Sequence, residues 1–242
     1  MGQVPTHHYL LIGSGSLARH LHFYISSLKS DSFELSTWNR QKDSFKDLKC
    51  KLEKSTHVLL AISDKAIEDF FKTHLEWSPK AQWLHFSGAH HFENLISAHP
   101  LMSFGPDLYS LETYRKIHFV LTGVDSLKEV FPFLENSFTK LPKEQRSFYH
   151  SLCVLGGNLP VLLWKKMLEG FEQLDLPEEA SNVYLETVLK NFLNHREKAL
   201  TGPLQRKDLV TIRKNLAALK DDAFHKIYSA FAEAQNIDTR DL

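Results

Sequence analysis

A short glycine-containing segment near the start of the chain constrains its fold more than any other feature of the sequence. The largely apolar residues 8–12 lead directly into Gly13-Ser14-Gly15-Ser16-Leu17-Ala18, and apolar residues then recur at helical spacing up to Leu28. The segment therefore fits the pattern G-x-G-x-x-A between a buried strand and a helix. In such a turn the first glycine permits a tight bend, the second admits a phosphate against the backbone, and the alanine allows close packing of the helix.

This pattern predicts that residues 13–18 hold the phosphates of a dinucleotide through main-chain amides and the N-terminus of the helix. The alternative is an ordinary glycine turn that joins a strand to a helix. The flanking strand and helix, together with another apolar run at residues 33–38, favour the phosphate-binding interpretation.

The first half of the chain alternates short apolar runs with helical patterns. Further strands are expected at residues 33–38, 57–62, 82–86 and 117–122, and helices at residues 45–52 and 63–71. Apolar strands that alternate with helices form parallel sheets that are covered on both faces. The expected fold of this half is therefore α/β, with a doubly wound parallel sheet.

Helical patterns replace this alternation after Pro142. Helices are expected at residues 144–171, 177–200, 209–219 and 223–234. Pro160 lies inside the first of them and predicts a kink there. We therefore expect an α/β domain at residues 1–142, followed by an all-helical domain at residues 143–242.

Charge and composition exclude several classes of partner. The 29 basic residues balance the 29 acidic ones, and a chain with no net charge lacks the basic field that nucleic acids or anionic membranes require. No run of about 18 apolar residues is present, so no membrane span is expected. The N-terminal residues lack the pattern of a signal peptide, and we therefore expect a cytoplasmic protein.

The ends of the second and third predicted strands refine the cofactor. An NAD site usually carries a carboxylate after the second strand, where it accepts hydrogen bonds from the ribose. Here the strand is followed by Asn39 and Arg40, and an amide next to a cation suits the 2′-phosphate of NADP. The third strand ends in Ala61, Ile62 and Ser63, which we expect to line the ribose and nicotinamide side; Ser63 is also suited to cap the next helix. NADP is therefore the predicted cofactor.

Three histidine-bearing segments are candidates for the reaction itself. His85 ends the fourth predicted strand, His99 follows in the next connection, and His150 opens the long helix of the second domain. Asn158 lies on the same face as His150 if that helix is continuous. A histidine near its ordinary pKa could donate a proton to a carbonyl during hydride transfer. Most of the fourteen histidines must be structural, and since no H-E-x-x-H spacing occurs, we expect no metal site.

Several segments together resemble a known family. They are residues 10–18, 85–89, 99–101, 149–150 with 157–158, and 200–203 with Arg206 and Asp208. The chain resembles the Rossmann-like DUF2520 family of predicted NADP-binding oxidoreductases, which are related to pyrroline-5-carboxylate reductase and ketopantoate reductase. The resemblance implies a Rossmann domain followed by a helical domain like that of 6-phosphogluconate dehydrogenase, and a homodimer formed through the helical domain.

The resemblance also bears on the site. His99-Pro100-Leu101 is similar to the His-Pro-Met of prephenate dehydrogenases, where the histidine lies near the substrate. Ketopantoate reductases carry Lys, Asn and Asn at four-residue steps on the first helix of the second domain, and the matching positions here are His150, Val154 and Asn158. The exchange of the lysine disfavours ketopantoate as the substrate.

These observations predict an NADP-dependent oxidoreductase that transfers a hydride between nicotinamide and a small carbonyl or imine compound in the cleft between the domains. His150 or His99 would supply the proton, and Asn158 would orient the substrate. The alternative is a sensor or scaffold protein that binds NADP(H) without turnover, which the missing lysine favours. A third interpretation is a deazaflavin-dependent reductase.

Overall fold

The computed structural model describes residues 6–28 and 31–239, and the chain divides into two compact units, Met1–Leu162 and Leu163–Leu242. The first unit extends beyond the boundary expected at residue 142, because helix α5 (Arg146–Cys153) bonds to the loops of the sheet. Residues 1–5, on which the expectation of no signal peptide rests, lie outside the described residues. Within the described residues, no helix combines the length and apolar character needed to cross a membrane.

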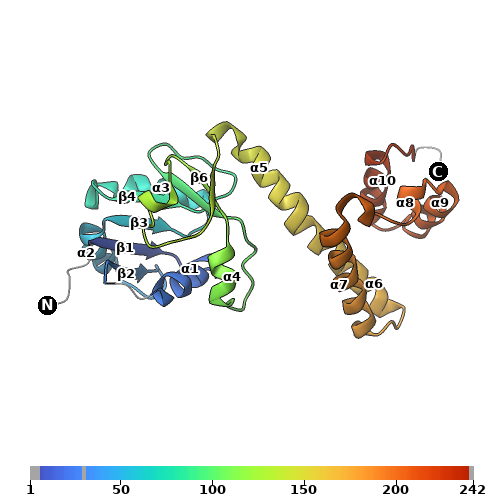
Figure 1. Cartoon of the computed structure of the whole chain (residues 1–242), viewed down its shortest axis with the longest axis horizontal. Helices are drawn as coiled ribbons and strands as arrows, with labels where there is room; N and C mark the ends of the chain where they lie inside the picture. The colour runs from blue at the N-terminus through green and yellow to red at the C-terminus, as the bar shows by residue number, and fades with distance from the viewer. Residues whose placement is uncertain (1–5, 29–30, 240–242) are drawn as a thin grey trace. The chain divides into compact units, whose positions relative to one another are not determined.

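The described part of the first unit contains one seven-stranded sheet. Figure 1 labels five of its strands, β1 to β4 and β6, and the flanking helices α1 to α4. The strand order is β2-β1-β3-β4-β5-β6-β7. The strands are β1 (His7–Ile12), β2 (Phe33–Trp38), β3 (His57–Leu60), β4 (Gln82–His85), β5 (Ile96–Pro100), β6 (Phe119–Thr122) and β7 (Phe138–Lys140). Neighbouring strands are parallel except for β5 and β6, which are antiparallel. The predicted α/β fold with a largely parallel sheet is confirmed.

The alternation of side chains along the strands explains how both faces are covered. Tyr9 and Leu11 of β1 pack on one face, in a core with residues of α1 (Ser16–Ser27) and α4 (Leu111–Lys116). Leu10 and Ile12 point to the other face and pack with residues of α2 (Phe45–Lys54) and α3 (Asp64–His74). Each such side chain stabilises the fold by about 1.5–3 kcal/mol when it is fully buried. This double burial is the reason that the central strands read as continuous apolar runs.

Two short strands, β5 and β7, were not expected from the sequence. We predicted that residues 99–101 lie in a connection, but His99 and Pro100 belong to β5, where they pair with Val120 and Phe119 of β6. The parallel ladder between β5 and β4 comprises only two residue pairs, and all of β7 is exposed. Neither strand carries the apolar run that identifies a buried strand in the sequence. Both form because they pair with strands that are distant in the sequence, which no local pattern predicts.

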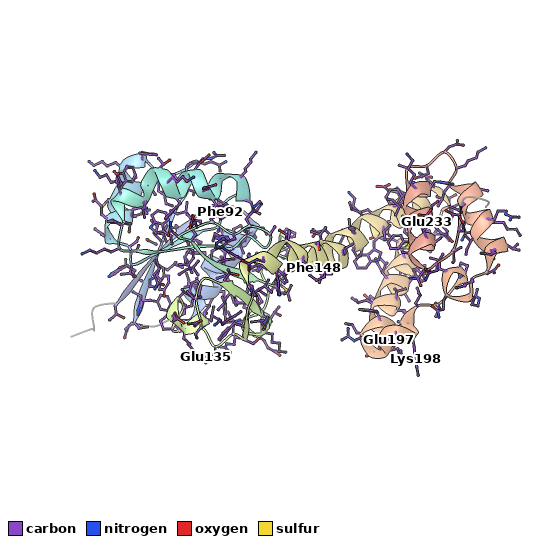
Figure 2. The ribbon with its side chains drawn as sticks, turned by 90° about the horizontal axis from the view of Figure 1, so that it is seen from above. Phe92, Glu135, Phe148, Glu197, Lys198 and Glu233 are labelled. Carbon is purple, nitrogen blue, oxygen red and sulfur yellow. The ribbon has the colours of Figure 1, made fainter. Side chains whose placement is uncertain are left out.

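The long helical stretch after the sheet is interrupted. It consists of α5, a π-helical turn at Val154–Asn158, and α6 (Leu159–Gln173). Pro160 has no amide hydrogen with which to continue the ladder, and Gly156 and Gly157 lie in the wider turn just before it. The side chain of Phe148 on α5, labelled in Figure 2, is 68% exposed.

The second unit is helical within the described residues. Its elements after α6 are α7 (Glu178–His195), α8 (Pro203–Arg206), α9 (Leu209–Ala218) and α10 (Phe224–Ala234). A 3-10 turn occurs at Arg196–Ala199, and the first unit contains three more, at Leu75–Trp77, Leu127–Glu129 and Lys143–Gln145. A small core of Ile212, Leu216, Ala232 and Ile237 joins α9, α10 and the segment that follows α10. Lys166 of α6 forms an ion pair with Asp222.

Candidate functional site

The turn after β1 needs its first glycine for the fold itself. Gly13 has a φ of +133°, and a Cβ added there would lie 2.2 Å from the carbonyl oxygen of Ala61. The amide of Ala61 donates to the carbonyl of Ile12 at 2.9 Å, which fixes the two strand ends side by side. Ala18 is buried, and its Cβ would be 3.6 Å from the added Cβ, so the small residues let α1 pack closely on the strand.

The fold does not require a glycine at the second position, Gly15. Gly15 is the N-cap of α1 with a φ of −72°, which any residue adopts readily. A Cβ added there would have no protein atom within 4 Å. Gly15 therefore faces open space beside the first amides of the helix, which have no partners within the helix and favour an anion.

This space belongs to a cavity of about 820 Å³ at the carboxyl ends of β1, β2 and β3. The cavity brings together three segments that sequence analysis singled out separately, namely residues 13–17, Asn39 with Arg40, and residues 61–63. Its other lining residues are Ile12, Trp38, Gln41, Asp43, Phe45, Ala66, Phe70 and His74. All the predicted cofactor-binding residues except Ala18 thus line one cavity. Ligands of parallel α/β sheets bind at this edge.

Hydrogen bonds within the protein limit what some of these side chains can do. The hydroxyl of Ser16 bonds with the carbonyls of Phe104 and Gly105 at 3.0 and 2.8 Å, so its contribution to a ligand would come from the main chain. Ser63 is the N-cap of α3, but its side chain makes no capping hydrogen bond. The hydroxyl of Ser63 therefore does not cap α3, contrary to the prediction from the sequence.

The loop after β2 holds both a cation and a carboxylate. Arg40 is exposed, and within the described part of the chain no hydrogen bond or ion pair of its guanidinium is found. Asp43, which the sequence analysis overlooked, accepts a hydrogen bond from the amide of Asn39 at 2.8 Å and lies 4.0 Å from Lys51. The carboxylate is thus engaged within its own loop, whereas the guanidinium is available to an anion.

Aromatic rings line the cavity beside α3. The rings of Phe70 and His74 are stacked with centroids 4.4 Å apart, and Phe45 meets His74 edge-on. Nδ1 of His74 is buried and has no hydrogen-bond partner within the described residues. The cavity therefore offers amides and a cation for phosphates, and flat aromatic faces for an aromatic base.

A second polar cluster lies where β4 and β5 end. A Cβ added at Gly88, in the loop after β4, would lie 2.4 Å from Nδ1 of His150 and 3.0 Å from Nε2 of His99. Nδ1 of His150 is buried without a hydrogen-bond partner among the described residues. Two of the predicted histidines therefore pack against one glycine, which leaves no room for a side chain at that position.

Arg146 holds this cluster together. Its side chain is fully buried, and its Nε donates to the carbonyl of His90 at 2.9 Å. One terminal nitrogen donates to Thr122 Oγ1 at 3.1 Å, and the other donates to the carbonyl of Ser87. Arg146 and His150 are four residues apart on α5, so the bonds of the first place the second over Gly88.

The other two predicted reaction residues are not brought to this point. His85 is fully buried in the core, where its Nδ1 accepts a hydrogen bond from the amide of Ser87 at 3.2 Å and its ring packs edge-on against Phe92. Asn158 is exposed at the end of the π-turn. The spacing that put Asn158 on the His150 face assumes a continuous α-helix, and it does not apply across that turn.

Burial controls the protonation of the histidines near the sheet. It lowers the pKa of His99 to about 4, with a further contribution from the nearby Arg146. It lowers the pKa of His85 to about 3, again with Arg146 as the second cause. Both imidazoles are therefore neutral at pH 7. His99 can donate or accept hydrogen bonds there, but it does not carry the additional proton that the sequence-based hypothesis allowed.

A known family model matches the second half of the chain. Residues 120–235 match the family described as "Domain of unknown function (DUF2520)". A search of curated proteins finds no significant match.

The DUF2520 segment includes α5 and hence Arg146, Tyr149, His150 and Asn158, whereas the phosphate-binding turn and its cavity precede it. Sequence analysis did not select Arg146, Tyr149 or Gly88 as site residues. The i, i+3 and i+4 spacing of Arg146, Tyr149 and His150 was the available signal.

Three solved structures are similar to this chain over most of their length. A Bacteroides fragilis protein provisionally assigned as an NADP oxidoreductase has a TM-score of 0.72 and 18% identity, with 96% of this chain and 99% of that chain covered. A Thermotoga maritima protein has a TM-score of 0.65 and 22% identity, with coverages of 94% and 96%. Plasmodium falciparum pyrroline carboxylate reductase with NADP bound has a TM-score of 0.60 and 12% identity, with coverages of 96% and 97%. These similarities show that the fold is shared with NADP-dependent reductases.

Lowering the pH from 6.5 to about 4 should destabilise the protein. The pKa values of His57, His85 and His99 are lowered to about 4, 3 and 4, chiefly by burial, from an ordinary value near 6.5. Between pH 6.5 and about 4 the unfolded chain binds protons that the native chain does not, so the free energy of unfolding falls as the pH falls. Each histidine contributes at most about 1.4 kcal/mol per pH unit.

Urea unfolding at pH 7.5, 6 and 5 measures this slope. His57, stacked on Tyr9 with centroids 4.5 Å apart, is not part of the cavity or of the cluster at Gly88. The pKa of His74 is also lowered by burial, so His57→Gln should reduce the slope by roughly a quarter to a third. A free energy of unfolding that stays constant between pH 7.5 and 5 would contradict the burial of these neutral rings.

Proposed function

We propose that this protein is an NADP(H)-dependent oxidoreductase that interconverts a small carbonyl or imine compound and the corresponding alcohol or amine. The observation that carries the proposal is Gly15, a glycine that neither its backbone conformation nor packing requires, at the rim of the 820 Å³ cavity. A ligand that must approach the main chain at this point explains the missing side chain.

The residues of the cavity suit the parts of NADP(H). The first amides of α1 would hold the diphosphate, and Arg40 would pair with the 2′-phosphate. Phe70 and His74, whose rings are stacked beside the cavity, would contact the adenine. Residues 61–63 would line the ribose on the nicotinamide side. When bound, NADPH would supply the hydride for the reaction.

The substrate would bind beside His99 and His150, the two histidines that pack against Gly88. Gly88 follows β4, the neighbour of β3 in the sheet, so it lies at the same edge as residues 61–63. His99 and His150 would hold the oxygen or nitrogen atom that takes up the proton, whereas Asn158, expected from the sequence to orient the substrate, lies across the π-turn from them. The Plasmodium falciparum reductase of similar fold, solved with NADP bound, supports this choice of cofactor.

Assays with purified protein distinguish catalysis from binding alone. Isothermal calorimetry with NADPH should show saturable binding, and NADPH should be oxidised in the presence of at least one member of a panel of keto acids, aldehydes and cyclic imines. Binding without oxidation across the panel would instead identify an NADP(H)-binding sensor. A preference for a reduced deazaflavin over NADPH would overturn the cofactor assignment.

Gly15→Val should abolish binding of NADPH and NADH while the protein remains folded. The new side chain fills the space beside the helix amides without meeting protein atoms near its Cβ. Calorimetry measures the binding, and circular dichroism verifies the fold. Gly170→Val is the matched control, because Gly170 also has no atom within 4 Å of an added Cβ but lies outside the cavity. Normal binding by Gly15→Val would refute the phosphate-binding turn.

Arg40→Ala should weaken NADPH binding by about tenfold to a hundredfold, since a hydrogen bond to a charged group contributes roughly 1.5–3 kcal/mol. NADH lacks the 2′-phosphate, and its affinity should change much less. Lys42→Ala provides the control, because Lys42 is an exposed cation in the same loop that does not line the cavity. An equal loss for both dinucleotides would reject the role of Arg40 in recognising the 2′-phosphate.

The expected homodimer remains a proposal, and α7 supports it. Among the described residues of this helix only Ser181 is buried. The helix exposes six large apolar side chains, those of Val183, Tyr184, Val188, Leu189, Phe192 and Leu193. Four-residue steps place most of them in one stripe, and a contiguous exposed stripe of this kind marks an interface. A second copy of the chain is the proposed occupant, because twofold dimers are the commonest assembly of soluble proteins.

Light scattering after gel filtration should therefore give twice the mass of the chain. The double variant Val188→Glu with Phe192→Glu should give the monomer mass, because two charges would enter an apolar contact. Lys190→Glu is the control on the same helix and should leave the mass of the assembly unchanged. A wild-type monomer at micromolar concentration would refute the dimer.

A further inference from the structure

One hydrogen bond links a strand of the sheet to α5 at the cluster around Gly88. Nδ1 of His99 lies 2.7 Å from the hydroxyl of Tyr149, and the two rings meet edge-on with centroids 5.5 Å apart. Either the phenol donates to Nδ1, or a proton on Nδ1 is donated to the phenol oxygen. The two arrangements differ in what the opposite nitrogen, Nε2, offers to a ligand.

The surroundings of the pair favour the first arrangement. His99 is neutral at pH 7, because burial, Arg146 and His150 together lower its pKa to about 4, and so its ring carries one proton. Burial raises the pKa of Tyr149, so the phenol keeps its proton and stays a donor. The Cys153 side chain is the other neighbour of the phenol. A thiol is a weak acceptor and imidazole a strong one, so the phenol proton goes to Nδ1 of His99.

The opposite nitrogen of His99 then carries the ring proton and lies against Gly88, where an added Cβ would be only 3.0 Å from it. Nδ1 of His150 packs against the same glycine and has no partner within the described residues. Nε2 of His99 is not among the buried nitrogens without a partner, so a ligand that reaches it would meet an N–H donor.

Charged neighbours leave this arrangement intact. Arg146 donates to the carbonyl of Ser87, next to Gly88, and opposes a second proton on His99. Asp64 favours protonation of His99, but its effect is smaller than those of burial, Arg146 and His150. Asp64 also accepts a hydrogen bond from Ser87 Oγ at 2.7 Å and lies 3.7 Å from His90 Nε2.

We propose that Tyr149 is a positioning residue that holds His99 in the tautomer with its proton on Nε2, so that a neutral N–H is available to a substrate bound beside the two histidines that pack against Gly88. The consequence for catalysis rests on the proposed function: as the substrate carbon is reduced, this N–H stabilises the negative charge that develops on the attached oxygen or nitrogen. Tyr149 acts through His99 and need not touch the substrate.

Nitrogen NMR of the histidine rings tests the tautomer without any assay of activity. In wild-type protein labelled with 15N-histidine at pH 7.5, the resonance set lost in His99→Gln identifies His99. Its Nδ1 should show the shift of an unprotonated nitrogen and its Nε2 the shift of a protonated one. The opposite assignment in the wild type would overturn the proposal, and this measurement requires no Tyr149 variant to fold.

Tyr149→Phe should then move both ring shifts of His99 towards those of a tautomer mixture. Tyr114→Phe is the matched control, because it removes a phenol bond of 2.6 Å to Nδ1 of another buried histidine, His20. The control should leave the His99 shifts unchanged. Unchanged His99 shifts in Tyr149→Phe would show that the phenol does not set the tautomer.

Kinetics separate this role from the proposed function. Tyr149→Phe should lower kcat by at least about tenfold, with little change in KM or in NADPH affinity, because only the orientation of the donor is lost. A loss confined to KM would contradict a positioning role. A wild-type protein that binds NADPH without turnover would overturn the proposed function, and the ring shifts would still decide whether Tyr149 sets the tautomer of His99.

Discussion

The close approach of two strand ends sets the geometry on which the candidate cofactor site depends. The carbonyl of Ala61 fills the space that a side chain at Gly13 would need, and the amide of Ala61 bonds to Ile12. This contact places the turn after β1 against the end of β3. Helix α1 consequently begins at the edge of the sheet, where its first amides can face a ligand. The fold and the site thus share one constraint, since Gly13, which permits the contact, also directs the N-terminus of α1 towards the ligand site.

A different kind of interaction assembles the region around Gly88. Burying the guanidinium of Arg146 is costly unless its donors are paired, and three oxygen acceptors from separate segments pair them. These bonds join α5 to the loop after β4 and to β6. They bring His150 and Tyr149 to His99, which comes from β5. The cluster therefore exists only because a helix far along the chain is anchored on the sheet.

The strongest signs of a ligand are features that the fold itself does not explain. Gly15 has an ordinary conformation and open space around it, and nitrogens of His74 and His150 are buried without partners among the described residues. Stable folds normally satisfy buried polar groups and use glycine only where the backbone requires it. Departures of this kind gather at functional sites, because selection there acts on binding as well as on stability.

The sequence by itself determined the features that short segments encode: the turn at residues 13–18, the buried central strands and the helical second half. It could do so because apolar periodicity and glycine spacing report local backbone geometry. Only the tertiary structure decided that β5 contains His99, that His85 is buried in the core, and that a π-turn breaks the spacing from His150 to Asn158. It also decided that Arg146 and Tyr149 position the two histidines. Those outcomes depend on contacts between residues far apart in the chain, which no local pattern records.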